Sequence, residues 1–261
     1  MSEYKNRIVK LFADKSDGSK KLICYFPVGD PIADSIKLAD VYFGAGVDVL
    51  EIGLAVEDPY LDGATVSDSM KRTRQAHSLD ECLEMVRQIR RNHPEGVLEI
   101  FCYKQIFERF PKEKFNDFLK EADIDCVLIP DHTMEENLHM HDWIYPSVSV
   151  LNFLPYNCDE ENLQFLSEHG DGFVFLQAVD GGTGARKELD PKLKEHIDLA
   201  MNRIKCAAVC PGFGISTPEH CRQVKEFGAD GLIIGSEVLK KTQESIEVLA
   251  KYLKECKDSL R

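Results

Sequence analysis

Short apolar runs alternate with longer stretches of helical periodicity along nearly the whole chain. The first run, Leu22–Val28, precedes a segment from Pro31 in which apolar residues recur every three or four positions. Runs that are apolar throughout are typical of parallel strands covered on both faces, whereas the intervening spacing is typical of amphipathic helices. This alternation restricts the chain to an α/β architecture in which a helix follows each strand.

The strand candidates are all short apolar runs, at Leu22–Val28, Val47–Leu54, Val97–Tyr103, Cys126–Pro130, Val148–Leu154, Phe173–Val179, Cys206–Cys210 and Gly231–Ile234. Between and after them, helices are predicted from Pro31, from Ser78, and at Lys112–Ala122, Met134–Ile144, Glu160–Glu168, Pro191–Ile204, Pro218–Phe227 and Val238–Ser259. Ser78 and Glu81 form a capping-box pattern, and a long polar loop is expected before them.

Eight strand–helix units in 261 residues predict a (β/α)8 TIM barrel that forms a single domain over residues 1–261. An extra N-terminal helix is expected around Tyr4–Ala13. A doubly wound open sheet is the alternative, but its glycine-rich turn belongs after the first strand. Here the G-x-G segment comes near the seventh strand, which favours the barrel.

Charge and cysteine content exclude several classes of protein. The net charge of −13 disfavours binding to nucleic acid or to an anionic membrane surface. No apolar run is long enough to span a membrane, so no membrane partner is expected. The nine cysteines include no C-x-x-C pair, and those in apolar runs, Cys206 among them, are interpreted as reduced core residues of a cytoplasmic protein.

Three glycine-rich segments follow the last three predicted strands, at 180–184, 212–216 and 235–236. In TIM barrels the active site lies at the carboxyl ends of the strands, and the loops after strands seven and eight commonly bind phosphate. A single cluster could consist of turn glycines only. Three clusters at the same end of consecutive strands predict a phosphate site, in which backbone N–H groups bind the anion.

Carboxyl groups are the acid–base candidates. Glu51 lies inside the strand Val47–Leu54, where it is either a catalytic group or one half of a buried salt bridge. The loop that follows adds Glu57, Asp58 and Asp62, which could be solvated or could bind a divalent cation. Lys104 is the one candidate for a Schiff-base lysine, although a solvated loop lysine is the simpler interpretation.

With these residues the sequence resembles the tryptophan synthase alpha subunit family over nearly its whole length. The most specific stretch is Leu50–Gly53 together with Asp58-Pro59, Asp62-Gly63 and Thr65. The resemblance implies retro-aldol cleavage of indole-3-glycerol phosphate to indole and glyceraldehyde 3-phosphate. It implies that Glu51 and Asp62 are catalytic, that neither a metal nor an organic cofactor is needed, and that a beta subunit is the partner in an alpha–beta hetero-oligomer.

The resemblance also implies the substrate-binding residues. The indole pocket would be formed by Tyr25, Phe101, Tyr103, Leu128, Phe153, Phe175, Phe213 and Ile233. The phosphate would be bound by Thr183, Gly184, Gly214, Gly235 and Ser236.

The chain departs from the family pattern in the loops that meet the beta subunit. Residues 55–57 read Ala-Val-Glu in place of Pro-Phe-Ser, Thr133 stands where a second proline is usual, and Lys104-Gln105 is unusual. Tyr25 and Phe175 exchange tyrosine and phenylalanine relative to the common pattern. Two alternatives therefore stay open, a barrel lyase or isomerase for another phosphorylated substrate and a non-catalytic homologue that binds a phosphorylated ligand.

Overall fold

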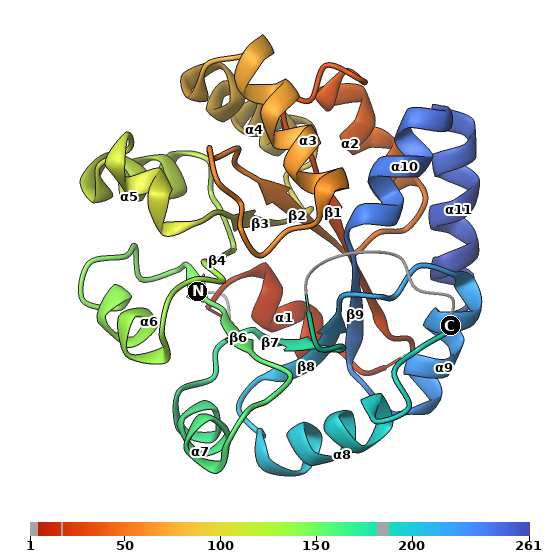
Figure 1. Cartoon of the computed structure of the whole chain (residues 1–261). Helices are drawn as coiled ribbons and strands as arrows, with labels where there is room; N and C mark the ends of the chain where they lie inside the picture. The colour runs from red at the N-terminus through yellow and green to blue at the C-terminus, as the bar shows by residue number, and fades with distance from the viewer. Residues whose placement is uncertain (1–4, 17, 182–187) are drawn as a thin grey trace.

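A ring of parallel strands stands at the centre of the molecule, and helices surround it (Figure 1). The structure is a computed structural model and describes residues 5–16, 18–181 and 188–261. Its architecture confirms the predicted (β/α)8 TIM barrel. The expected extra N-terminal helix is present as α1 (Arg7–Ala13).

The elements follow one another in chain order: α1, β1 (Lys21–Phe26), α2 (Ser35–Gly44), β2 (Val49–Gly53), α3 (Ala64–Ala76), α4 (Leu79–Asn92), β3 (Val97–Phe101), η1 (Lys104–Glu108), α5 (Lys112–Glu121), β4 (Cys126–Leu128), α6 (Met134–Met140), β5 (Ser149–Val150), β6 (Asn152–Leu154), α7 (Glu160–His169), β7 (Phe173–Gln177), α8 (Leu193–Arg203), β8 (Ala208–Gly212), α9 (Pro218–Glu226), β9 (Gly231–Ile234), α10 (Ser236–Glu244) and α11 (Ile246–Asp258).

The strands form two hydrogen-bonded sheets, in the orders β5-β4-β3-β2-β1-β9 and β6-β7-β8. At one junction only Leu151 separates β5 from β6, and its N–H donates to Val127 O at 2.9 Å. At the other, the N–H of Asp230 donates to Val209 O and its carboxylate accepts from the Val209 N–H, both at 3.0 Å. These contacts join the two sheets into one ring.

The strand register decides which side chains share the barrel interior. Tyr25 pairs with Glu51, Glu51 with Glu99, and Glu99 with Cys126. Successive residues of a strand point to opposite faces, so paired residues on neighbouring strands share a face. Because Glu51 faces the interior, the carboxyl group of Glu99 does so too.

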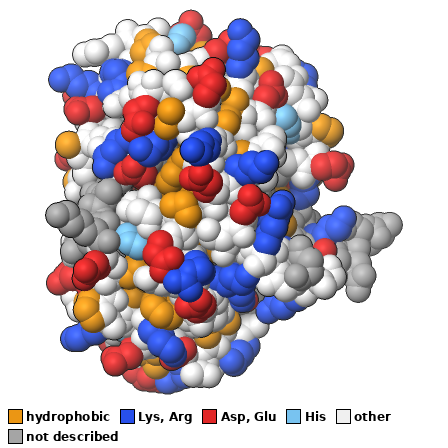
Figure 2. All heavy atoms as spheres, turned by 90° about the vertical axis from the view of Figure 1, so that its right-hand side faces the viewer, with side chains coloured by type: hydrophobic (Ala, Val, Ile, Leu, Met, Phe, Trp, Pro, Cys, Tyr) orange, Lys and Arg blue, Asp and Glu red, His pale blue; other side chains and the backbone are white. Residues whose placement is uncertain are grey.

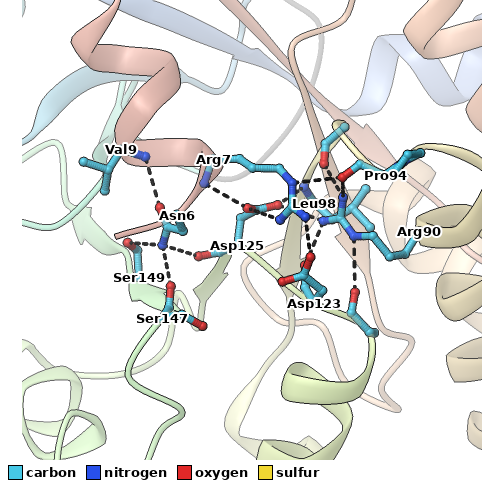
Figure 3. Close-up of polar contacts among 12 residues, drawn as sticks. Asn6, Arg7, Val9, Arg90, Pro94, Leu98, Asp123, Asp125, Ser147 and Ser149 are labelled. Atoms are coloured by element: carbon cyan, nitrogen blue, oxygen red, sulfur yellow. Dashed lines mark hydrogen bonds and ion pairs between the residues drawn. The ribbon is translucent and has the colours of Figure 1, made fainter. Parts of the chain in front are cut away.

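The start of α1 is bonded to the segments that precede β4 and β5 (Figure 3). Asn6 caps this helix and donates to Asp125 O at 2.9 Å and to Ser147 O at 2.6 Å. The Asp125 carboxylate is fully buried and pairs with Arg7 at 3.0 Å and with Arg90 at 2.9 Å (Figure 3). A buried charge with two cationic partners ties α1 and α4 to the start of β4.

The outer helices carry charges of both signs. Figure 2 shows Lys and Arg side chains interspersed with Asp and Glu over one side of the molecule. On α10, for example, Lys241 pairs with Glu244 at 2.8 Å and with Glu237 at 3.6 Å. Pairs at this spacing are typical of solvated helix faces, and this side presents no extended patch of one sign.

Two helix predictions need correction. The expected closing helix Val238–Ser259 is two helices, because Ser245 adopts an extended backbone and its side chain caps α11 by accepting the Val248 N–H. The expected polar loop before Ser78 contains α3, which buries only a narrow stripe that includes Val66 and Met70. In contrast, the capping box at Ser78 is confirmed.

The seventh strand was placed too early in the chain. It spans Ala208–Gly212 and not Cys206–Cys210, and Cys206 is exposed, which contradicts its interpretation as a core residue. Pro211 lies inside the strand, and proline normally indicates a strand end because it lacks an N–H donor. Cys24, Cys102, Cys126 and Cys210 are buried as predicted.

Candidate active site

A pocket opens at the carboxyl ends of the strands, where the barrel architecture places active sites. Its walls are residues from the ends of five strands, from the loops after β2 and β8, and from the first turns of α3 and α10: Tyr25, Glu51, Asp62, Val66, Phe101, Phe175, Phe213, Gly214, Ile215, Ile233, Gly235 and Ser236. The pocket thus brings together both predicted catalytic carboxyl groups and most of the predicted substrate-binding residues. Val66 and Ile215 were not predicted.

Aromatic rings form much of the pocket wall. Phe175 packs against Phe213 and against Phe153, with ring centroids 5.3 Å apart in each case. Tyr25 meets Phe101 edge to face at 6.1 Å. Such a wall suits a flat apolar ring.

Three predicted indole-pocket residues do not line this cavity. Phe153 supports Phe175 and Phe213 from behind, and Leu128 is fully buried. Tyr103 acts through Asp62, because its Oη donates to Asp62 Oδ2 at 2.7 Å.

Two strand glycines make room for the aromatic rings. A Cβ atom on Gly53 would stand 2.2 Å from Tyr25 Oη, and one on Gly212 would stand 2.4 Å from Phe175 Cζ. Any side chain at either position would therefore displace a pocket residue. Tyr25 and Phe175 can occupy these positions only because β2 and β8 end in glycine.

The electrostatics of Glu51 differ from those of an ordinary carboxylate. Glu51 is 3% exposed, and its Oε1 has no hydrogen-bond partner among the described residues. Burial and then the charge of Asp62 raise the pKa of Glu51 from 4.5 to about 8. Glu51 is therefore mainly a neutral acid at pH 7, and no salt bridge joins it to any of the described residues.

Asp62 has a polar environment by comparison. It lies on the loop between β2 and α3, where the phenol of Tyr103 donates to it. Burial and then Asp62 raise the pKa of Tyr103, so this phenol stays a hydrogen-bond donor over the whole physiological range. The two carboxyl groups of the pocket therefore differ. Oε1 of Glu51 has no hydrogen-bond donor among the described residues, whereas Asp62 accepts a hydrogen bond from the neutral phenol of Tyr103.

Glu99 is a buried carboxyl group that the sequence reasoning missed. It lies directly beside Glu51 in the strand register, is 0% exposed, and does not line the pocket. A signal was present in the sequence, because Leu98-Glu99-Ile100 repeats the pattern of Leu50-Glu51-Ile52. A charge between two apolar residues of a buried strand points into the barrel in both cases.

The predicted phosphate residues lie on two neighbouring segments. Gly214 has φ +76° directly after β8, and the preceding Phe213 holds φ +71°, a conformation that is uncommon for a side chain other than glycine. Gly235 and Ser236 begin α10, and its amino-terminal dipole favours an anion. Tyr252 anchors the first loop by donating to Ser216 O at 3.0 Å. Thr183 and Gly184 lie outside the described residues.

The divergent loops contact one another at the rim. Lys104 pairs with Glu136 at 2.7 Å and does not line the pocket, which agrees with its interpretation as a loop lysine. Gln105 accepts the N–H of Glu57 at 2.7 Å, so the unusual residues of two loops form one contact. Thr133, in place of a proline, caps α6, and its N–H donates to Glu136 at 2.7 Å. A proline could not make this last bond.

No group of three or more His, Cys, Asp or Glu side chains within the described ranges is arranged to hold a metal ion. One carboxylate of the acidic loop after β2 instead pairs with a cation of the protein. Glu57, for example, lies 3.6 Å from Arg74.

The comparisons with known proteins identify the family of the chain. A family model described as "Tryptophan synthase alpha chain" matches residues 11–261. The chain belongs to this family. The tryptophan synthase alpha chain of Caldanaerobacter subterraneus subsp. tengcongensis is 30% identical over 258 residues, which are 97% of this chain and 96% of that protein.

Solved structures of the family share the fold. The tryptophan synthase subunit alpha of Legionella pneumophila strain Paris aligns with a TM-score of 0.85 at 25% identity and covers 98% of each chain. Mycobacterium tuberculosis tryptophan synthase is 22% identical and shares the fold with a TM-score of 0.84. The predicted family is thereby confirmed, and its members are lyases of tryptophan biosynthesis. Within the described ranges, no helix is both long and apolar enough to cross a membrane.

Proposed function

We propose that the chain cleaves indole-3-glycerol phosphate by a retro-aldol reaction to indole and glyceraldehyde 3-phosphate. The observation that carries this proposal is the pair of carboxyl groups in one aromatic pocket, Glu51 and Asp62, of which Glu51 is a neutral acid at pH 7. The reaction needs an acid that becomes a base and a separate negative charge, and these two environments supply them.

In the first step, the indole ring lies against the aromatic wall and Glu51 donates its proton to the ring carbon that carries the glycerol chain. The ring becomes a cation whose charge is greatest at its N–H group. The Asp62 carboxylate, which Tyr103 holds at 2.7 Å, stabilises that charge.

In the second step, Glu51 is a carboxylate and accepts the proton of the glycerol hydroxyl next to the ring. The carbon–carbon bond breaks, its electron pair returns to the ring to give neutral indole, and the hydroxyl carbon becomes the aldehyde of glyceraldehyde 3-phosphate. Glu51 has then given one proton and taken one back, so no metal, oxidant or cofactor enters the balance.

The phosphate of the substrate would bind at Gly214, Gly235 and Ser236, where the loop after β8 meets the amino terminus of α10. We infer that Thr183 and Gly184 complete this site. Binding at a fixed distance from the carboxyl groups would orient the glycerol chain for cleavage.

A beta subunit is the partner we infer, because the relatives are each one chain of a synthase. Tyr60 supports this inference, since it is 61% exposed on the loop after β2, and its ring lies 5.7 Å from that of Tyr103. An exposed aromatic residue next to a catalytic loop is a common feature of protein interfaces. The divergent contacts of Lys104 and Gln105 lie in the same region and would adapt this surface to its own partner.

The test is release of indole from indole-3-glycerol phosphate by the purified chain, measured with and without a beta subunit. Asp62→Asn should lower turnover at least about 100-fold and leave binding of glycerol 3-phosphate unchanged. Asp58→Asn is the matched control, because it removes an exposed carboxylate from the same loop, and it should retain activity without the partner. Absence of indole release under both conditions, with glycerol 3-phosphate still bound, would refute the proposed reaction.

A further inference from the structure

The interior carboxyl group of Glu99 takes no part in either step of the proposed reaction. Glu99 and Glu51 occupy paired positions on β3 and β2, whose backbones lie about 4.8 Å apart. Both side chains face the barrel interior. Glu51 lines the pocket, whereas Glu99 does not line it and is completely buried.

Both carboxyl groups have buried oxygen atoms without a hydrogen-bond partner among the described residues. Neither Oε1 nor Oε2 of Glu99 has a partner among the described residues, and the same holds for Oε1 of Glu51. A buried polar group without a partner is destabilising, so such groups are rare in folded proteins and call for an explanation. A glutamate side chain has enough rotational freedom to close the gap between adjacent strands, and catalytic hydrogen bonds are often open before substrate binds.

The charge balance decides which group keeps its proton. Burial and then Glu51 raise the pKa of Glu99 well above its ordinary value, and no cation acts on either carboxyl group among the described residues. Two adjacent acids in a low-dielectric interior do not ionise together. Glu51 opens to the pocket and substrate, so it is the group that loses its proton, and Glu99 stays neutral.

We propose that Glu99 is a positioning residue for Glu51: it remains a neutral carboxylic acid and donates its O–H to the Glu51 carboxylate whenever Glu51 has given its proton to the substrate. The proposal rests on the proposed function for the identity of that substrate. The donated hydrogen bond stabilises the carboxylate form of Glu51 and directs its second oxygen toward the glycerol hydroxyl. Glu99 itself does not touch the substrate.

The other titratable groups near the pair leave Oε1 of Glu51 without a hydrogen-bond partner among the described residues. Four of these groups are neutral phenols or thiols whose pKa is raised by burial: Tyr25 and Cys24 on β1, Cys126 on β4 and Cys210 on β8. The fifth is the carboxylate of Asp62 on the loop after β2. The negative charge of Asp62 makes ionisation of Glu51 harder. Neither carboxyl oxygen of Glu99 has a hydrogen-bond partner among the described residues, so the O–H of Glu99 is available to ionised Glu51.

The test compares Glu99→Leu, which removes the donor, with Glu99→Gln, which retains one in its amide group. The acid dissociation constant of Glu51 is measured by carbon-13 NMR on protein labelled at the glutamate carboxyl carbon, with resonances assigned from the Glu51→Gln and Glu99→Gln spectra. Glu99→Leu should lower this constant about tenfold, and Glu99→Gln should change it less than about threefold. Cys126→Ala, the register neighbour on the other side of Glu99, is the packing control and should leave it unchanged.

The sign of the change makes the result decisive. An increase of the Glu51 dissociation constant in Glu99→Leu would mean that Glu99 carries a charge that repels Glu51, and no change would mean that the two groups do not interact. Either result overturns the proposal. The pH dependence of indole release should follow the same order among the variants.

The NMR measurement needs no turnover, so the two proposals fail separately. If Glu99→Leu lowers the dissociation constant of Glu51 as expected but neither the wild type nor any variant releases indole, the proposed reaction is wrong. The proposed role of Glu99 is then still supported. If indole release depends on Glu51 but Glu99→Leu leaves the dissociation constant of Glu51 unchanged, the proposed role of Glu99 is wrong. The proposed reaction is then still supported.

Discussion

Glu51 is expected to destabilise the folded protein, and increasingly so as the pH rises. Its pKa is about 8 in the folded protein and near 4.5 when it is exposed to solvent. Between these values the unfolded chain has lost a proton that the folded chain retains. Because the folded state binds more protons, the free energy of unfolding falls as the pH rises through this window. Below about 4.5 the penalty is absent, and above about 8 it is complete.

The magnitude follows from the two pKa values. They differ by about 3.5, which corresponds to about 5 kcal/mol for the complete effect. Between pH values of about 5.5 and about 8.5 the penalty should grow by about 3 kcal/mol. Glu51→Gln keeps the shape of the neutral side chain and cannot ionise, so the penalty should vanish in this variant. Its melting temperature relative to wild type should therefore rise by roughly 6–12 °C over that pH range.

The assay is thermal and denaturant unfolding of wild type and Glu51→Gln at both pH values. Glu57→Gln is the control, because Glu57 is exposed on the adjacent loop, and its stability difference from wild type should stay nearly constant. The same Glu51→Gln protein should lose indole release by at least about 100-fold. A stability difference between Glu51→Gln and wild type that does not change with pH would refute the electrostatic reasoning, whatever the activity.

Three further substitutions test other parts of the structure. Tyr103→Phe removes the donor to Asp62 and should lower kcat/KM for indole release about tenfold, and an unchanged value would contradict its role. Gly212→Ala places a Cβ atom 2.4 Å from a pocket ring, so it should weaken indole binding measured by calorimetry, and wild-type affinity would show that the ring adapts. Arg90→Met leaves the buried Asp125 with one cation fewer and should lower the free energy of unfolding by about 3 kcal/mol in urea titration, while a loss below about 1 kcal/mol would make this contact unimportant.

Local patterns in the sequence predicted most of the secondary structure. The strand Gly231–Ile234 and the capped start of α4 at Ser78 match because each depends on residues adjacent in the chain. The errors occurred where local preference and tertiary packing disagree. The sequence of α3 is polar enough to be a loop, but it becomes helical where Val66 packs at the pocket and Met70 is buried. Pro211 is tolerated inside β8 although proline usually interrupts a strand.

The chain order by itself located the chemistry at the strand ends, because a barrel of parallel strands gathers all its carboxyl ends on one face. Glu51, the carboxylates of the following loop and the glycines after β8 became candidates in this way, and the family resemblance singled out Asp62. The structure brings Glu51, Asp62 and Gly214 into one pocket. Sequence spacing could not separate residues that line the pocket from those that support it. Leu128 is the example, since it ends a strand like the others but is fully buried.

Tertiary structure alone decided how the carboxyl groups behave. The sequence determined that Glu51 lies in a buried strand, but both a salt bridge and a catalytic acid were compatible with that position. The register of β2 against β3 places Glu99 beside it, and the fold brings the charge of Asp62 close, while no cation acts on Glu51 among the described residues. A pKa depends on burial and on charges within a few ångströms, and those distances are set by strand pairing and not by neighbours along the chain.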